Sequence, residues 1–187
     1  MTNDNRRPHD IAILDAIDAS PREPVTAPVW RVVRSGRDPL LGSTSRSRWC
    51  NAKFDVLYTS FERDGAIAEI YSLLSLQPVF PSNIRWEIHQ IRVSTRQTLR
   101  LADLASLGRL GVDVARFRER AYERTQEIAD AAFFLGFDGL IAPSARWACL
   151  NLILFTDRVQ SDQLETTDAV VETIDWEAWR KHARVTS

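Results

Sequence analysis

The chain has 187 residues, of which 44% are hydrophobic, and its formal net charge is −1. This composition suits one compact domain with its own core, and the near-zero charge excludes a protein held to nucleic acid or membrane by overall charge. The charge is unevenly placed, because residues 29–53 carry six basic side chains and one acid, whereas residues 160–179 carry six acids and no base. The first of these segments therefore favours an anionic ligand.

Residues 1–20 are expected to form an N-terminal tail and a short helix. The first eight residues are polar, and Ile11, Leu14 and Ile17 then follow at helical spacing. The rest of the chain, residues 21–187, is expected to form a single domain.

No segment of the sequence predicts export or a membrane anchor. The N-terminus has no apolar stretch of the signal-peptide kind, and the longest apolar run, residues 148–155, is too short to cross a bilayer. The two cysteines, Cys50 and Cys149, lack metal-ligand spacing and fit reduced thiols. We therefore expect a cytoplasmic protein.

Strands and helices are mixed along the domain. A proline-rich connection precedes the first strand, and Ser60 is expected to cap the helix that carries Glu69. The helical pattern that ends at Gly136 is expected to be broken, and Asp175 is expected to cap a last helix. Strands are predicted at 28–34, 55–59, 84–93, 139–143, 148–156 and 169–174, and helices at 9–19, 65–74, 114–135 and 176–183. This order predicts an α+β domain rather than a doubly wound parallel sheet.

Glu69 is the one charged side chain in the helical run 65–74, GAIAEIYSLL. A carboxylate is costly to bury without a partner, so Glu69 either has a buried partner or lies on a solvent-facing side of its helix. The second interpretation stays open, because Ile67, Ile70 and Leu74 belong to an apolar stripe that does not need Glu69.

The common catalytic motifs do not occur in the sequence. It has no glycine-rich dinucleotide loop, no P-loop and no nucleophile elbow, and its three histidines have no metal-ligand pairing. Five of the six tryptophans neighbour an arginine, which suits single-stranded nucleic acid, but neighbours in a strand point to opposite faces. We therefore expect neither a metal site nor direct binding of nucleic acid.

A set of side chains on separate elements offers another chemistry. Two arginines suit a pyrophosphate, an aromatic face suits a flat base, and a carboxylate can stabilise an oxocarbenium ion. These are the groups needed to split the N-glycosidic bond of a nucleotide, although each alone is common as a structural residue. The set consists of Arg31, Arg48, Tyr58, Glu69, Ser144 and Arg146.

The chain resembles the RES domain family. The resemblance rests on WRVVR, SRSRWCNAKFDVLYTS, AIAEI, TQEIADAAFFLGFDGLIAPSAR and NLILF, in this order, and spans residues 29–157. By position, the arginine, glutamate and serine of the family fall on Arg31, Glu69 and Ser144. Its loop arginine falls on Arg48, followed by the aromatic Trp49, and its strand-end tyrosine falls on Tyr58.

This resemblance implies a fold similar to that of ADP-ribosyltransferases and a bacterial toxin that cleaves NAD, its substrate, at the nicotinamide–ribose bond. Glu69, Arg31 and Tyr58 would be catalytic, and Arg31, Arg48, Tyr58, Ser144 and Trp49 would bind NAD. An Xre-type antitoxin would be the partner that blocks the active site. We expect transfer of ADP-ribose to a protein, with an NAD glycohydrolase or phosphorylase as the alternative and a non-catalytic binding module as a further one.

The loop that contains Arg48 departs from the family pattern. The family usually has Gly-Gly-Arg-Trp/Phe-Asn, whereas this chain has Arg46-Ser47-Arg48-Trp49-Cys50, with Asn51 one place late. Loss of the glycines restricts the loop backbone. We therefore expect the loop to hold NAD differently, and on this basis we place a protein acceptor ahead of water or phosphate.

Overall fold

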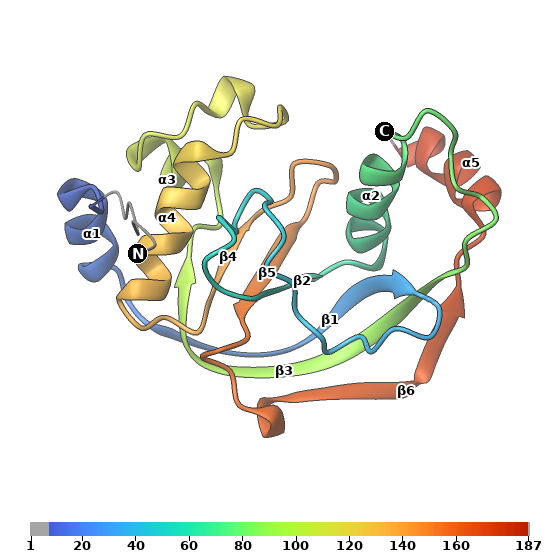
Figure 1. The fold of residues 1–187 in the computed structure, drawn as a ribbon, viewed down its shortest axis with the longest axis horizontal. Helices are drawn as coiled ribbons and strands as arrows, with labels where there is room; N and C mark the ends of the chain where they lie inside the picture. Colours follow the sequence, from blue (N-terminus) through green and yellow to red (C-terminus); the bar gives the residue numbers. More distant parts are fainter. Residues whose placement is uncertain (1–7, 187) are drawn as a thin grey trace, which may run out of the picture.

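The computed structural model describes residues 8–186 and has a six-stranded mixed sheet in the order β1-β2-β5-β4-β3-β6, with a further pairing of β1 and β3 (Figure 1). Helices α1, α3 and α4 gather at one end of the molecule, and α2 and α5 at the other. The α+β prediction is therefore confirmed. The strands are β1 (Glu23–Arg34), β2 (Val56–Ser60), β3 (Trp86–Arg100), β4 (Gly139–Pro143), β5 (Leu150–Phe155) and β6 (Leu164–Thr173). The helices are α1 (Ile11–Asp18), α2 (Arg63–Leu74), α3 (Leu104–Arg109), α4 (Glu123–Phe134) and α5 (Trp176–Thr186).

The sheet opens between its first two strands. β1 pairs with β3 along most of its length, and β2 pairs with β5 over all five of its residues. β1 and β2, in contrast, are joined only at Trp30 and Ser60. The two strands therefore diverge from this junction and leave room between them for other side chains.

Three clusters of apolar side chains hold these elements together. The largest packs α1 and α4 against β4 and β5, and it contains Ile13, Ile128 and the buried Trp49. A second joins α2 to α5 through aromatic contacts such as that of Tyr71 with Trp179, whose ring centroids lie 5.0 Å apart. The third cluster packs side chains of the strands against one another. Helix α2 is thus fixed from two sides, by the sheet and by α5.

Most of the predicted elements are present, with shifted ends. The helix near 114–135 is broken, as predicted, into a short 3-10 turn (Val114–Arg116) and α4, and it stops before Gly136, which has a φ of 84°. Asp175 accepts hydrogen bonds from the N–H groups of Glu177 and Ala178 and caps α5, which confirms that prediction. Residues 1–7 of the predicted polar tail lie outside the described residues.

Three sequence predictions about these elements are wrong. The proline-rich connection is largely strand, because β1 already begins at Glu23 and, having only one contact with β2, keeps an open edge that tolerates prolines. Ser60 does not cap α2; it ends β2, and Glu62 occupies the N-cap position without a side-chain cap bond. The strand predicted at 84–93 continues to Arg100, since its second half pairs with β4.

Candidate functional site

A cavity of about 450 Å³ lies where β1 and β2 diverge. Its walls come from β1, the loop before β2, β2 itself, α2 and the adjoining ends of β4 and β5. Six of the seven predicted site residues line it, and the seventh, Ser144, is hydrogen-bonded to one of them. The lining members are Arg31, Arg48, Trp49, Tyr58, Glu69 and Arg146.

Glu69 faces this cavity and has two polar partners. Its Oε1 atom accepts a hydrogen bond of 2.7 Å from the Ser144 hydroxyl and one of 3.0 Å from the side-chain amide of Asn151. Its Oε2 atom receives no hydrogen bond from the described residues. Glu69 is therefore not an ordinary solvent-facing residue. One carboxylate oxygen is anchored by two hydrogen bonds, and the other is available to a ligand.

The Ser144 hydroxyl is oriented by the turn that follows β4. Its oxygen accepts hydrogen bonds from the backbone N–H groups of Arg146, at 3.1 Å, and Trp147, at 3.2 Å. Because both bonds occupy acceptor positions of the hydroxyl, its proton is directed toward Glu69. Ser144 thus fixes the rotamer of the carboxylate rather than reaching into the cavity itself.

Helix α2 brings Glu69 close because its sheet-facing side consists of small residues. Gly65, Ala66 and Ala68 are buried there. A Cβ atom on Gly65 would overlap the Cys149 thiol and would lie 2.5 Å from the Ser60 hydroxyl. Only glycine permits this approach of the helix to the strands.

Arg31 lies on β1 and makes no ion pair with an acidic side chain in the part of the chain that the structure describes. One terminal nitrogen, Nη2, donates a hydrogen bond of 2.8 Å to the carbonyl of Leu41, and Nε is buried without a partner among the described residues. Burial, assisted by the nearby positive charge of Arg37, lowers the pKa of Arg31 to about 10. A guanidinium that is partly stripped of water and unpaired is a strong site for an anion.

Tyr58 ties the loop before β2 to the site. Its hydroxyl accepts a hydrogen bond of 2.8 Å from the N–H of Trp49 and bonds the Ser47 hydroxyl at 2.8 Å. Burial raises the pKa of Tyr58, so the phenol stays neutral. The Trp49 side chain is 2% exposed and belongs to the largest apolar cluster, so it forms part of the cavity wall at its base.

Arg48 and Arg146 lie on the side of the cavity that faces the segment after α3. Arg48 donates to the carbonyl of Glu119 at 3.1 Å and lies over the rings of Phe117 and Tyr122. Arg146 donates to the carbonyl of Arg118 at 2.8 Å. Burial lowers the pKa of Arg48, while the charge of Glu69 opposes this and that of Arg146 adds to it. The Arg48 guanidinium therefore interacts with the charges of both Glu69 and Arg146.

The sequence interpretation missed several residues of the site. Asn151 was visible only as a polar residue inside the apolar strand LNLILF, and that interruption was the available signal. The other missed residues, all of which line the cavity, lie at strand ends or in the segments between elements. Arg34 ends β1 and Trp86 begins β3, whereas Arg37 and Arg120 come from turns, where no periodicity marks them.

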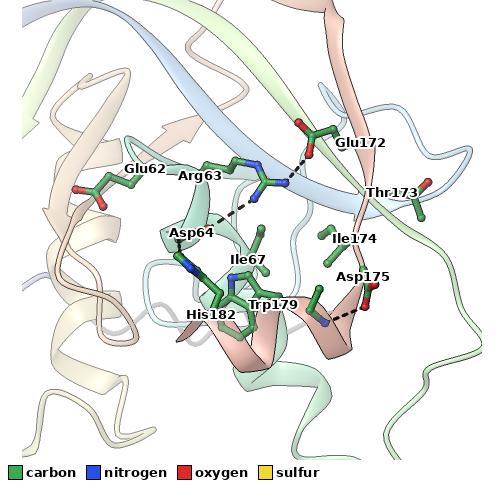
Figure 2. Close-up of a pocket in the computed structure, with 11 residues that line it drawn as sticks. Glu62, Arg63, Asp64, Ile67, Glu172, Thr173, Ile174, Asp175, Trp179 and His182 are labelled. Atoms are coloured by element: carbon green, nitrogen blue, oxygen red, sulfur yellow. Dashed lines mark hydrogen bonds and ion pairs between the residues drawn. The ribbon is translucent and has the colours of Figure 1, made fainter. Parts of the chain in front are cut away.

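A second cavity, of about 640 Å³, lies between the start of α2, the end of β6 and α5 (Figure 2). Figure 2 shows two pairs among its charged side chains: Arg63 bonds Glu172 at 2.5 Å, and Asp64 bonds His182 at 2.9 Å. It contains no residue that the sequence predicted for the site. We therefore place the candidate site in the cavity of Glu69, where the lining arginines make no ion pair with an acid of residues 8–186.

Two further features bear on the kind of protein. Within residues 8–186, no group of three or more His, Cys, Asp or Glu residues could hold a metal ion. No helix in the same range is long and apolar enough to cross a membrane.

Comparisons with known proteins bear on the fold and the family of the chain. No curated protein matches the chain. Among solved structures, its fold is similar to that of a chain in the crystal structure of the M. tuberculosis MbcT–MbcA toxin–antitoxin complex, with a TM-score of 0.79 and 18% sequence identity over 92% of this chain and 97% of that one. The model of the RES domain matches residues 28–178, most of the chain. The chain therefore belongs to the RES domain family, as its motifs predict.

Proposed function

We propose that the protein is the toxin of a toxin–antitoxin pair and that it cleaves NAD at the nicotinamide–ribose bond. The observation that carries this proposal is the Glu69 carboxylate, anchored through Oε1 and lining a cavity whose other charged residues are all arginines. The arginines can bind the phosphates of NAD through charge-assisted hydrogen bonds, and the carboxylate can stabilise the positive charge that develops on the ribose. Membership of the RES domain family supports the same reaction.

Each residue has a defined part in this reaction. Arg31 and Arg48 hold the pyrophosphate, and the Tyr58 ring contacts the nicotinamide. As the C–N bond breaks, its electron pair leaves with nicotinamide, and Glu69 stabilises the oxocarbenium charge that forms on the ribose. Ser144 and Asn151 keep the Glu69 carboxylate in position, and the acceptor then attacks the ribose carbon and loses a proton.

The acceptor is either a protein side chain or a small molecule. We propose transfer to a protein, because the loop around Arg48 departs from the family pattern and is held to Tyr58 by two hydrogen bonds. An NAD glycohydrolase or phosphorylase is the second candidate. The interaction of Arg48 with both Glu69 and Arg146 favours it, since two cations without acidic partners among the described residues could hold a small anionic acceptor in the same cavity.

We also propose a protein partner that blocks the cavity in the resting cell, an antitoxin of the Xre type. The support is the fold shared with a chain from a toxin–antitoxin complex. A carboxylate or chain terminus of such a partner could bond Arg31 or Arg48 in place of the NAD phosphates.

Glu69→Gln tests the proposed function. The change keeps the size of the side chain but removes its charge, and loss of one such electrostatic contact typically lowers the rate on the order of 100- to 1000-fold. The measurement is nicotinamide release from NAD, with mass analysis of the ADP-ribose product to identify the acceptor. Glu127→Gln on α4, whose carboxylate bonds Arg124 outside the cavity, is the matched control. Equal nicotinamide release by wild type and Glu69→Gln would show that Glu69 is not catalytic.

A further inference from the structure

The cavity carries far more positive charge than its one carboxylate balances. Its lining residues include Glu69 as the only acid, and none of the lining arginines makes an ion pair with a carboxylate of the described residues. Outside the cavity, six other arginines of the described residues do form ion pairs with carboxylates: Arg22, Arg63, Arg92, Arg100, Arg116 and Arg124. The unpaired lining arginines are Arg31, Arg34, Arg37, Arg48, Arg120 and Arg146.

Two of these arginines, Arg31 and Arg34, lie on β1, and Arg37 follows in the loop after it. The junction of Trp30 with Ser60 marks the end near Glu69, because Ser60 pairs with Asn151, which bonds Glu69. Arg34 lies four residues farther along β1, which corresponds to about 13 Å at the rise of a strand. The cavity therefore has a reacting end and a distant end.

The distant end combines an aromatic ring with two exposed cations. The guanidinium carbon of Arg34 lies 5.7 Å from the ring centroid of Trp86, and Arg37 has only a long contact of 3.4 Å with the carbonyl of Gly42. The one acid in this loop, Asp38, does not line the cavity and accepts a hydrogen bond from the N–H of Leu40. This end can therefore receive both a flat base and a further phosphate.

We propose that the cavity binds NADP, with its 2′-phosphate held by Arg34 and Arg37; this rests on the proposed function. A dinucleotide with its nicotinamide ribose at Glu69 directs its adenosine toward Trp86. The pyrophosphate of NAD occupies the arginines between the two ends and leaves Arg34 and Arg37 without a phosphate. Arginine forks match the oxygens of a phosphate monoester, and arginines near the adenosine ribose accommodate a 2′-phosphate in other dinucleotide sites.

The test compares kcat/KM for NADP and NAD, measured as nicotinamide release, in the wild type and in the double variant Arg34→Gln/Arg37→Gln. Charge-assisted hydrogen bonds to a phosphate are worth enough for a tenfold effect, so the NADP-to-NAD ratio should fall at least tenfold in the double variant. Arg109→Gln is the control, because Arg109 bonds only Ser106 on α3 and lies outside the cavity. A smaller fall in the ratio overturns the proposal.

A binding measurement separates this proposal from the proposed reaction. Calorimetry should show that adenosine 2′,5′-bisphosphate binds the wild type at least tenfold more tightly than 5′-AMP, and that the double variant loses this preference. Equal binding of the two nucleotides to the wild type overturns the proposal whether or not any dinucleotide is cleaved. Discrimination without cleavage of either dinucleotide would support the phosphate site and contradict the proposed reaction.

Discussion

Replacement of Arg31 by methionine should stabilise the protein while removing its response to NAD. Arg31 is a mostly buried cation whose Nε has no partner among the described residues and whose one hydrogen bond there goes to the carbonyl of Leu41. Replacing a buried charge that lacks an ionic partner with an apolar side chain of similar length removes the cost of its desolvation. The same change removes the guanidinium that we propose binds the pyrophosphate.

The magnitude follows from the pKa of Arg31. Its lowering to about 10, caused mainly by burial, corresponds to roughly 3 kcal/mol at about 1.4 kcal/mol for each tenfold change in acidity. Loss of the hydrogen bond to the Leu41 carbonyl offsets about 1.5 kcal/mol of this stabilisation or somewhat more. Because Leu41 is exposed, water can replace the lost donor. We therefore expect a net gain of about 1–2 kcal/mol, or about 2–8 °C in Tm for a domain of this size.

Thermal unfolding with and without NAD measures both effects. These measurements use the Glu69→Gln variant, which keeps NAD intact. At an NAD concentration 100 times its Kd, the free energy of unfolding of this variant should rise by about 2.7 kcal/mol. The double variant Glu69→Gln/Arg31→Met should gain little from NAD. Arg92→Met is the control, since Arg92 is exposed and bonds Glu165 at 3.1 Å on the far edge of the sheet. A loss of 2 kcal/mol or more in the Arg31→Met protein would show that Arg31 stabilises the fold and would refute the reasoning.

Two further predictions concern access to the site. Gly65→Ala should destabilise the protein by about 1–3 kcal/mol and lower nicotinamide release, because the new methyl group forces α2 away from Ser60 and Cys149. Gly108→Ala is the control and should leave activity unchanged, since the atom nearest to its new methyl group would be 3.6 Å away. Unchanged activity of Gly65→Ala would contradict the placement of Glu69 by close packing. In the purified complex with its antitoxin, NAD binding measured by calorimetry should be abolished, and NAD binding as tight as that of the free protein would rule out a blocked cavity.

The sequence was most informative where one face of an element is buried. The stripe of Ile67, Ile70 and Leu74 predicted α2, and the glycine at 136 marked the end of α4, because both features follow from local backbone geometry. The extent of β3 was not predictable in the same way, since residues 94–100 are mostly polar and become strand only by pairing with β1 and β4. Tertiary pairing decided the conformation there rather than local propensity.

The site was predictable by residue type but not by arrangement. Chemistry and family resemblance pointed to Arg31, Glu69 and Ser144, and the structure brings all three to the cavity region or into contact with its carboxylate. The position of Asn151 beside Glu69 depends on the registry of β2 with β5, which spans more than 80 residues of sequence. Non-local registry of this kind leaves no periodic signal, so the second partner of the carboxylate emerged only from the fold.

The charges of the cavity also constrain the order of events in the proposed reaction. Glu69 is one negative charge among six lining guanidinium groups, so in the empty cavity the net field opposes a positive charge on a ribose. Phosphates that bind the arginines neutralise that field, and only then does the free oxygen of Glu69 face a developing cation without competing repulsion. Binding of the phosphates is thus a condition for catalysis by Glu69, and a nicotinamide riboside that lacks phosphates should find the same carboxylate in an unfavourable field. The unpaired arginines therefore act in selection of the substrate as well as in its affinity, because a ligand that cannot neutralise them leaves the carboxylate ineffective.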